Sequence, residues 1–233
     1  MNGSRLLNLQ SFVDFKIDFA ARDVPQFVFM TPNMMNDGHN TSIEFATSWA
    51  HHFIEPMLED KAFDGRTLIM LTYDESETYE KPNHVVTLLL GSAIAPELRG
   101  TTDDTVYTHY SILSSVEHNW ELPNLGRYDV GANVFKFAAD ISGYSLNRDP
   151  DNIATVNNSG PYPGALHSDE RKFMPIPRPN LDLVGAGGMS VLPKIKMEWM
   201  SALDRSTPYD GSGNLVDGGE HLPVYMPEAA NSK

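Results

Sequence analysis

The chain has 233 residues, of which 41% are hydrophobic, so it is long enough to bury one sizeable core. Its 31 acidic and 17 basic residues give a formal net charge of -14, which argues against binding to nucleic acid or to an anionic membrane surface. The sequence has no cysteine, which excludes disulfides, and no apolar stretch approaches the roughly 18 residues of a transmembrane helix.

The N-terminal part of the chain predicts a helix, a strand and a second helix. The segment "SFVDFKIDFAA", residues 11–21, matches the spacing of both a helix and a strand, and we favour the helix. The run "FVFMT", residues 27–31, predicts a buried strand. Thr41 and Glu44 form a capping-box pattern that opens the next helix, and Pro56 is expected to kink or end it. The apolar face of this helix is Ile43, Ala46, Ala50 and Phe53.

Two further strands and a helix are predicted beyond this point. The apolar runs "TLIMLTY", residues 67–73, and "HVVTLLLG", residues 84–91, predict strands, the first of them buried on both faces. Residues 102–120 predict a helix. Its apolar face is Ile112, Leu113, Val116 and Trp120. Apolar strands that alternate with helices are typical of an α/β fold with a parallel sheet covered by helices.

The last third of the chain has a different composition. Residues 155–233 are richer in proline and glycine than residues 1–154, which predicts a loop-rich extension packing on the same domain. One short helix is expected near "KIKMEWMSAL", residues 194–203. The glycines at 185–188 do not follow a strand as a dinucleotide fingerprint would, and "YDGSGNLVDGG", residues 209–219, lacks the glycine and the bidentate glutamate of a calcium loop.

Acidic residues follow one of the predicted strands at its carboxyl end. Asp74 and Glu75 come directly after residues 67–73, and His39 lies in the loop that follows the strand at 27–31. Open parallel sheets bind ligands where such loops gather, so we expect the two loops to lie side by side. Neighbouring carboxylates repel unless a cation neutralises them, and oxygen ligands favour a hard divalent ion such as Mg²⁺, Ca²⁺ or Mn²⁺. The alternative is that these acids and His39 are only solvated loop residues.

Four longer stretches carry a resemblance to a known family. They are "VPQFVFMTPNMMNDGHNTS", "TLIMLTYDES", "YTHYSILSSVEHNWELPNLGRYD" and "TPYDGSGNLVDG". In this order they resemble the fungal secreted acid phosphatases of the phosphoesterase family, which also contains bacterial phospholipases C. The resemblance implies an alkaline-phosphatase-like α/β fold: a mixed, mostly parallel sheet flanked by helices, incomplete at the N-terminus, with a loop-rich C-terminal extension. Residues 1–154 would be the C-terminal part of the catalytic domain.

The same resemblance implies roles for four side chains. Asp74 and Glu75 are similar to the family's metal-coordinating acidic pair. His39 resembles the histidine that protonates the leaving alcohol, and His109 in "THYS" resembles a second catalytic histidine near the pocket. The implied activity is metal-dependent hydrolysis of small phosphate monoesters. A phospholipase C-type phosphodiesterase and a non-catalytic binding module on the same fold remain alternatives.

The chain also departs from the family's pattern. Relatives carry an upstream half with a Glu-Asn pair that completes the metal site and a serine or threonine nucleophile. The N-terminal residues here supply neither, so the chain is expected to be inactive alone and to expose strand edges and an uncovered apolar face. The resemblance implies a secreted protein. Of the glycosylation sequons at Asn2, Asn40 and Asn157, the one at Asn157 is favoured.

Overall fold

A computed structural model describes residues 8–78, 80–157, 168–169, 176–202 and 206–215. The chain forms two compact units. The first contains residues 1–71 and 88–99, and the second contains residues 72–87 and 100–233. The composition boundary near residue 154 therefore falls inside the second unit.

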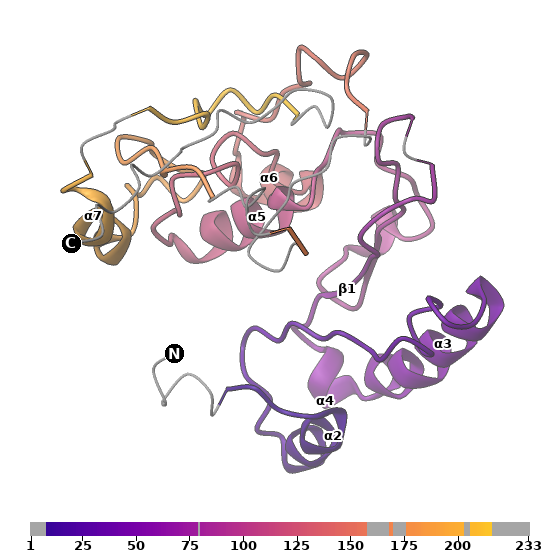
Figure 1. The fold of residues 1–233 in the computed structure, drawn as a ribbon. Coiled ribbons are helices and arrows are strands. Elements are labelled where there is room, and N and C mark those ends of the chain that lie inside the picture. The colour runs from indigo at the N-terminus through magenta and orange to yellow at the C-terminus, as the bar shows by residue number, and fades with distance from the viewer. Residues whose placement is uncertain (1–7, 79, 158–167, 170–175, 203–205, 216–233) are drawn as a thin grey trace, which may run out of the picture. The chain divides into compact units, whose positions relative to one another are not determined.

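Short helices joined by long loops make up most of both units (Figure 1). The first unit holds α2 (Phe12–Ala21), α3 (Ile43–Glu59), α4 (Lys61–Asp64), β1 (Ile69–Leu71), β2 (Leu88–Leu90) and the 3₁₀ helix η1 (Pro96–Leu98). The second unit holds α5 (Tyr110–Trp120), α6 (Lys136–Ser142) and α7 (Pro193–Trp199). The helices predicted near 11–21 and near 194–203 are confirmed. The helix predicted at 102–120 forms only from Tyr110 onward, since residues 102–109 are not helical.

The first two helices begin at capping side chains. Ser11 and Asp14 form a capping box at α2, in which the Ser11 hydroxyl accepts from the Asp14 N–H and the Asp14 carboxylate accepts from the Ser11 N–H. At α3 the cap is Ser42, whose hydroxyl accepts from the backbone N–H of Phe45. The predicted capping box of Thr41 and Glu44 is therefore wrong, because the helix starts one residue later.

The structure corrects the apolar face predicted for α3. The helix continues past Pro56 to Glu59, so Pro56 does not end it, and a kink at this residue stays a prediction. Its buried residues are Ala50, Ile54 and Met57. Ile43, which was expected on the apolar face, is 68% exposed. The register of the buried face follows the residues that contact α2 and the strands, and hydrophobic spacing alone does not distinguish neighbouring registers.

The two described strands form one small antiparallel sheet. Ile69 pairs with Leu90 and Leu71 pairs with Leu88. β1 is half-buried, so the expectation of a strand buried on both faces is wrong. The mostly parallel sheet of the predicted fold stays a prediction, since these strands neither establish nor contradict it.

The strand predicted at residues 27–31 is also wrong. These residues are irregular, and Phe29 is 77% exposed. A strand needs a partner for its backbone N–H and C=O groups, and no described strand pairs with this segment. Apolar composition alone therefore did not make it a strand.

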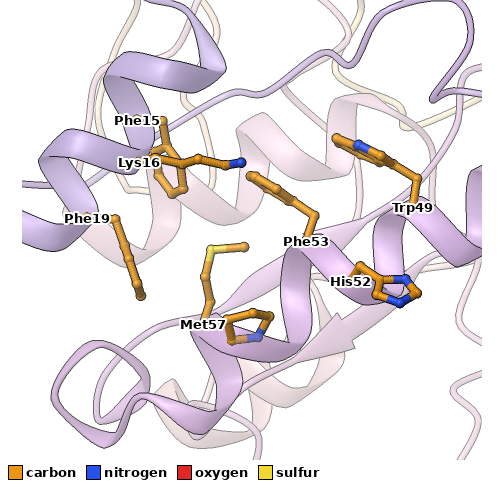
Figure 2. Close-up of a pocket in the computed structure, with 8 residues that line it drawn as sticks. Phe15, Lys16, Phe19, Trp49, His52, Phe53 and Met57 are labelled. Carbon is orange, nitrogen blue, oxygen red and sulfur yellow. The ribbon is translucent and has the colours of Figure 1, made fainter.

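Aromatic packing between helices forms the core of the first unit. The buried residues Ala50, Ile54 and Met57 are surrounded by half-buried apolar side chains from α2, α3, α4 and both strands. Phe53 of α3 packs on Phe15 of α2 with ring centroids 5.9 Å apart. A groove of about 310 Å³ opens beside this packing (Figure 2). Its lining residues are Phe15, Lys16, Phe19, Trp49, His52, Phe53, Pro56 and Met57, and no candidate site residue is among them.

The second unit buries polar side chains as well as apolar ones such as Val134 and Val191. The buried residues of α5 are Ser111, Ser114, Ser115 and Glu117. The apolar face predicted for this helix is therefore wrong, and Leu113 and Trp120 are 38% and 40% exposed. The Ser114 hydroxyl donates to the Ala132 carbonyl at 2.8 Å, and the Ser115 hydroxyl accepts from the Phe135 N–H at 2.9 Å. These bonds join α5 to the segment that leads into α6.

Within the described parts of the chain, none of the helices combines the length and the apolar character needed to cross a membrane.

Candidate active site

The candidate site lies in the loop of residues 72–87, which belongs to the second unit. Two side-chain contacts hold the two ends of this loop together. The hydroxyls of Thr72 and Thr87 lie 2.9 Å apart, and the Tyr73 hydroxyl accepts from the Val86 N–H at 3.1 Å. The two ends of the loop therefore lie close together, and the loop is closed at its base.

Asp74 and Glu75 lie in this loop, and both are exposed. The Asp74 carboxylate accepts from the backbone N–H of Glu75 at 2.9 Å. This bond holds one oxygen of the Asp74 carboxylate in place. The structure thus presents two adjacent carboxylates to solvent. That they bind a cation stays a prediction.

Asn83 fixes the backbone around the acidic pair. Its side-chain amide donates to the Asp74 carbonyl at 2.8 Å, and its side-chain oxygen accepts from the Ser76 N–H at 2.8 Å. The nitrogen and the oxygen of the Asn83 side chain therefore both bond across the loop, to residues 74 and 76. Sequence reasoning missed Asn83, because an asparagine in a proline-containing turn gives no signal that separates this role from ordinary turn formation.

His109 lies directly before α5 and contacts the same loop. Its Nε2 lies 2.7 Å from the Asp74 carbonyl oxygen. A carbonyl oxygen can only accept, so Nε2 carries the proton and Nδ1 is left as an acceptor in the neutral ring. The predicted catalytic histidine is therefore next to the predicted metal pair, but through the Asp74 backbone and not through its carboxylate.

The start of α5 places His109 by neighbouring contacts. The Ser111 hydroxyl accepts from the Thr108 N–H at 3.1 Å, and the Thr108 hydroxyl accepts from the Tyr110 N–H at 3.2 Å. The Tyr110 ring lies 5.3 Å from that of Tyr128. Burial raises the pKa of Tyr110, so its phenol stays protonated in the physiological range. These contacts fix the backbone from which the imidazole of His109 extends.

His39 lies in a tight loop of the first unit and is exposed. Its backbone N–H donates to the Asp37 carboxylate at 2.8 Å. The Thr41 hydroxyl closes the loop by donating to the Met35 carbonyl at 2.6 Å. Hydrogen bonds of the loop therefore engage the backbone of His39 and not its ring. That His39 joins Asp74 and Glu75 in one site stays a prediction.

The donor set was tested against the divalent metal that the sequence implies. No group of three or more His, Cys, Asp or Glu side chains that could hold a metal occurs among the residues that the structure describes. Asp74 and Glu75 are of the right chemistry but are only two side chains, whereas oxygen-binding divalent ions take about six or more ligands. The acidic pair alone does not make a complete metal site.

The sequence of this chain matches a known protein family. The phosphoesterase family matches residues 2–123, a segment that includes Asp74, Glu75, His39 and His109. No solved structure matches the chain.

Three curated fungal relatives are similar over most of this chain. A probable acid phosphatase of Kluyveromyces lactis is 43% identical over 85% of this chain and 46% of its own length. An acid phosphatase of Aspergillus fumigatus is 44% identical over 75% of this chain and 39% of its own length. An acid phosphatase of Aspergillus niger is 40% identical over 91% of this chain and 52% of its own length.

The chain thus spans about half the length of the curated relatives it matches. The match to the family covers more than half of the chain, and it includes the loop and the histidines described above. The chain belongs to the phosphoesterase family.

Proposed function

We propose that this chain contributes to a phosphoester hydrolase that acts on small phosphate monoesters, as an acid phosphatase. The names of the three fungal relatives support the reaction class. The observation that carries the proposal is the acidic loop, in which Asn83 and His109 both donate to the Asp74 carbonyl. These bonds fix the backbone that carries the two carboxylates, and a fixed backbone favours ligand binding.

Asp74 and Glu75 take the role of metal ligands in this proposal. A divalent ion supplies positive charge against phosphoryl oxygens when it is bound. Because two side chains do not complete a site, we propose that further ligands join them. Within the chain itself, the task of Asp74 and Glu75 is to hold negative charge at one place on the loop. His109 is a positioning residue, since its contact is with the Asp74 backbone.

His39 takes the role of general acid. A leaving alcohol departs more easily when a proton reaches its oxygen as the phosphoester bond breaks. The exposed ring of His39 is open to such a contact, because the bonds of its loop use only its backbone.

We propose that the chain alone has little or no activity. Its described residues do not form a complete metal site, and none of them is assigned as the nucleophile. Secretion is proposed from the resemblance to secreted phosphatases. The sequon at Asn157 is proposed as the glycosylated one, while Asn2 lies outside the described residues. Asn40 adjoins His39, where a glycan would obstruct the general acid.

Aryl phosphate hydrolysis tests this function. The 233-residue chain is assayed alone, and joined behind the N-terminal half of the Aspergillus niger acid phosphatase, at pH 5 with Mg²⁺, Ca²⁺ or Mn²⁺. The joined protein is expected to hydrolyse the substrate, and Asp74→Ala or His39→Ala to reduce its turnover at least about 100-fold. Glu121→Gln, an exposed change outside the loop, is the control and should leave turnover unchanged.

Two outcomes would overturn the proposal. A joined protein that melts cooperatively but hydrolyses no phosphate ester would favour the non-catalytic module. A joined protein that cleaves a lipid phosphodiester much faster than the aryl phosphate would favour the phospholipase C-type alternative.

A further inference from the structure

Two acidic side chains are buried side by side in the second unit, away from the loop of residues 72–87. Glu117 of α5 is 5% exposed, and Asp129, in the loop after α5, is 1% exposed. Asp129 is the neighbouring group that, together with burial, raises the pKa of Glu117. Buried acids are uncommon unless they are paired, so this pair needs a physical explanation.

Two backbone N–H groups hold the Asp129 carboxyl group in place. One of its oxygens accepts from the Leu125 N–H at 2.6 Å, and the other accepts from the Arg127 N–H at 2.8 Å. A carboxyl oxygen has more than one lone pair, so Asp129 can also accept a hydrogen bond from a protonated acid beside it.

Glu117 is placed to be that donor. Its Oε2 atom is buried and has no hydrogen-bond partner within the described residues. None of the ion pairs found in the described parts of the chain involves Glu117 or Asp129. Burial and the negative charge of Asp129 together raise the pKa of Glu117 to about 9. A second anion at this place would be neither solvated nor neutralised.

The neighbouring charged groups point elsewhere. The Arg127 guanidinium donates to the Pro177 carbonyl and to the Tyr209 hydroxyl. The His118 ring lies 3.0 Å from the Ala186 carbonyl through Nδ1 and 2.7 Å from the Ser142 hydroxyl through Nε2. Asp129 is therefore the titratable group that faces Glu117, and it governs whether the Glu117 carboxyl group carries a proton.

The segment of residues 183–192 packs directly on this pair. A Cβ atom added to Gly185 would lie 3.3 Å from Glu117 Oε2, and one added to Gly187 would lie 2.4 Å from the Glu117 carbonyl oxygen. Asn124 clamps the segment further, because its side-chain amide donates to the Met189 carbonyl at 2.8 Å. The glycines let the backbone of 183–192 cover the carboxyl of Glu117, which leaves little space for water.

We propose that Glu117 and Asp129 share a single proton, and that this proton keeps the segment of residues 183–192 closed over α5. Release of the proton leaves two carboxylates under the segment, and the segment opens to hydrate them. The shared proton makes the second unit more stable in acid than in mildly alkaline solution. It does not depend on the proposed phosphatase function.

The direction of the pH effect follows from linkage. The folded chain holds the Glu117 proton more tightly than the unfolded chain, in which the pKa returns toward its ordinary value of 4.5. The stability from this group is therefore complete below about pH 4.5 and is lost progressively as the pH rises toward about 9. Most carboxylates in proteins act in the opposite direction, so the sign is diagnostic.

Urea unfolding from pH 5 to pH 9 tests the proposal in the 233-residue chain. The unfolding midpoint of the wild type is expected to fall steadily over this range. Glu117→Gln keeps a donor toward Asp129 but cannot ionise, so the decline should be much shallower. Glu121→Gln, which removes an exposed glutamate one turn away, should follow the wild type. Parallel declines for wild type and Glu117→Gln would overturn the proposal.

A direct titration of the wild type tests the shared proton even if Glu117→Gln fails to fold. Carboxyl ¹³C NMR on glutamate-labelled wild type should show one resonance that titrates above about pH 7, whereas ordinary glutamates titrate near pH 4.3. Backbone amides of residues 185, 188 and 192 should lose hydrogen-exchange protection over the same pH range, because their N–H groups bond within the covering segment or to Asn124. If every glutamate titrates below about pH 6, the shared proton does not exist.

Discussion

The two units of this chain differ in the kinds of side chain that they bury. In the first, apolar side chains meet between helices, as Phe53 of α3 does with Phe12 of α2. In the second, fully buried apolar residues such as Val134 and Val191 lie beside fully buried polar ones, Asn124 and Asp129, which bond to backbone groups of loops. Apolar packing tolerates small shifts of register, whereas buried polar groups require particular partners.

This difference explains why a loop-rich unit can have a defined structure. Long loops contain many backbone N–H and C=O groups that no helix or sheet satisfies. Asparagine side chains supply the missing partners: Asn133 donates to the Val106 and Arg148 carbonyls, and Asn147 accepts from the Val134 N–H. The acidic loop of residues 72–87 uses Asn83 in the same way.

The largest effect is expected from removing one of these asparagines. Asn124→Ala leaves the Gly126 N–H, which bonds to Asn124 Oδ1 at 2.9 Å, without a partner in a fully buried place. We expect the second unit to lose about 3 kcal/mol of unfolding free energy. Hydrogen-exchange mass spectrometry over residues 110–120 and 183–192 measures it. The exposed Asn40→Ala is the control, and equal exchange in both variants would contradict the polar account of the second unit.

A smaller effect is expected from the aromatic cluster of the first unit. Phe53 is half-buried between rings, and Phe53→Ala should destabilise the first unit by about 2 kcal/mol. Phe29 is 77% exposed, so Phe29→Ala should change stability by less than about 0.5 kcal/mol. Exchange of α3 amides reports both variants. If Phe29→Ala cost as much as Phe53→Ala, residues 27–31 would belong to a packed structure after all.

The smallest effect is expected at the start of α2. Ser11→Ala removes the hydroxyl that accepts from the Asp14 N–H and donates to its carboxylate at 2.7 Å. This should cost about 1 kcal/mol, confined to the first unit. The same hydrogen bonds lower the pKa of Asp14, so the cost should shrink as the pH falls and Asp14 takes up a proton. A change in the amide exchange of α5 would show that the units are not separable in this way.

Local chemistry could be predicted from the sequence better than packing could. The helix at α2 and the acidic pair at residues 74 and 75 follow from spacing and residue type. The face that α5 buries could not be foreseen, because Ser114 and Ser115 are buried only where the Ala132 carbonyl and the Phe135 N–H reach them. Contacts between residues far apart in the chain decide such cases, and a local pattern does not contain them.

The candidate site shows the same limit. The family resemblance suggested His109, but its contact with the Asp74 carbonyl depends on a fold that brings positions 35 residues apart together. Asn83 and the Glu117–Asp129 pair carry no motif at all. Each becomes visible only when its hydrogen-bond partners are known.

Manganese titration followed by NMR tests the central claim most directly, namely that the acidic loop beside His109 is the place where a cation binds. Substoichiometric Mn²⁺ is added to the isotope-labelled chain, and the paramagnetic broadening of each backbone amide signal is measured. We predict that the signals of Asp74, Glu75 and His109 broaden first, and that Asp74→Asn with Glu75→Gln removes this effect while Glu121→Gln keeps it. Broadening that is unchanged by the paired substitution, or that begins elsewhere on the acidic surface, would contradict the account.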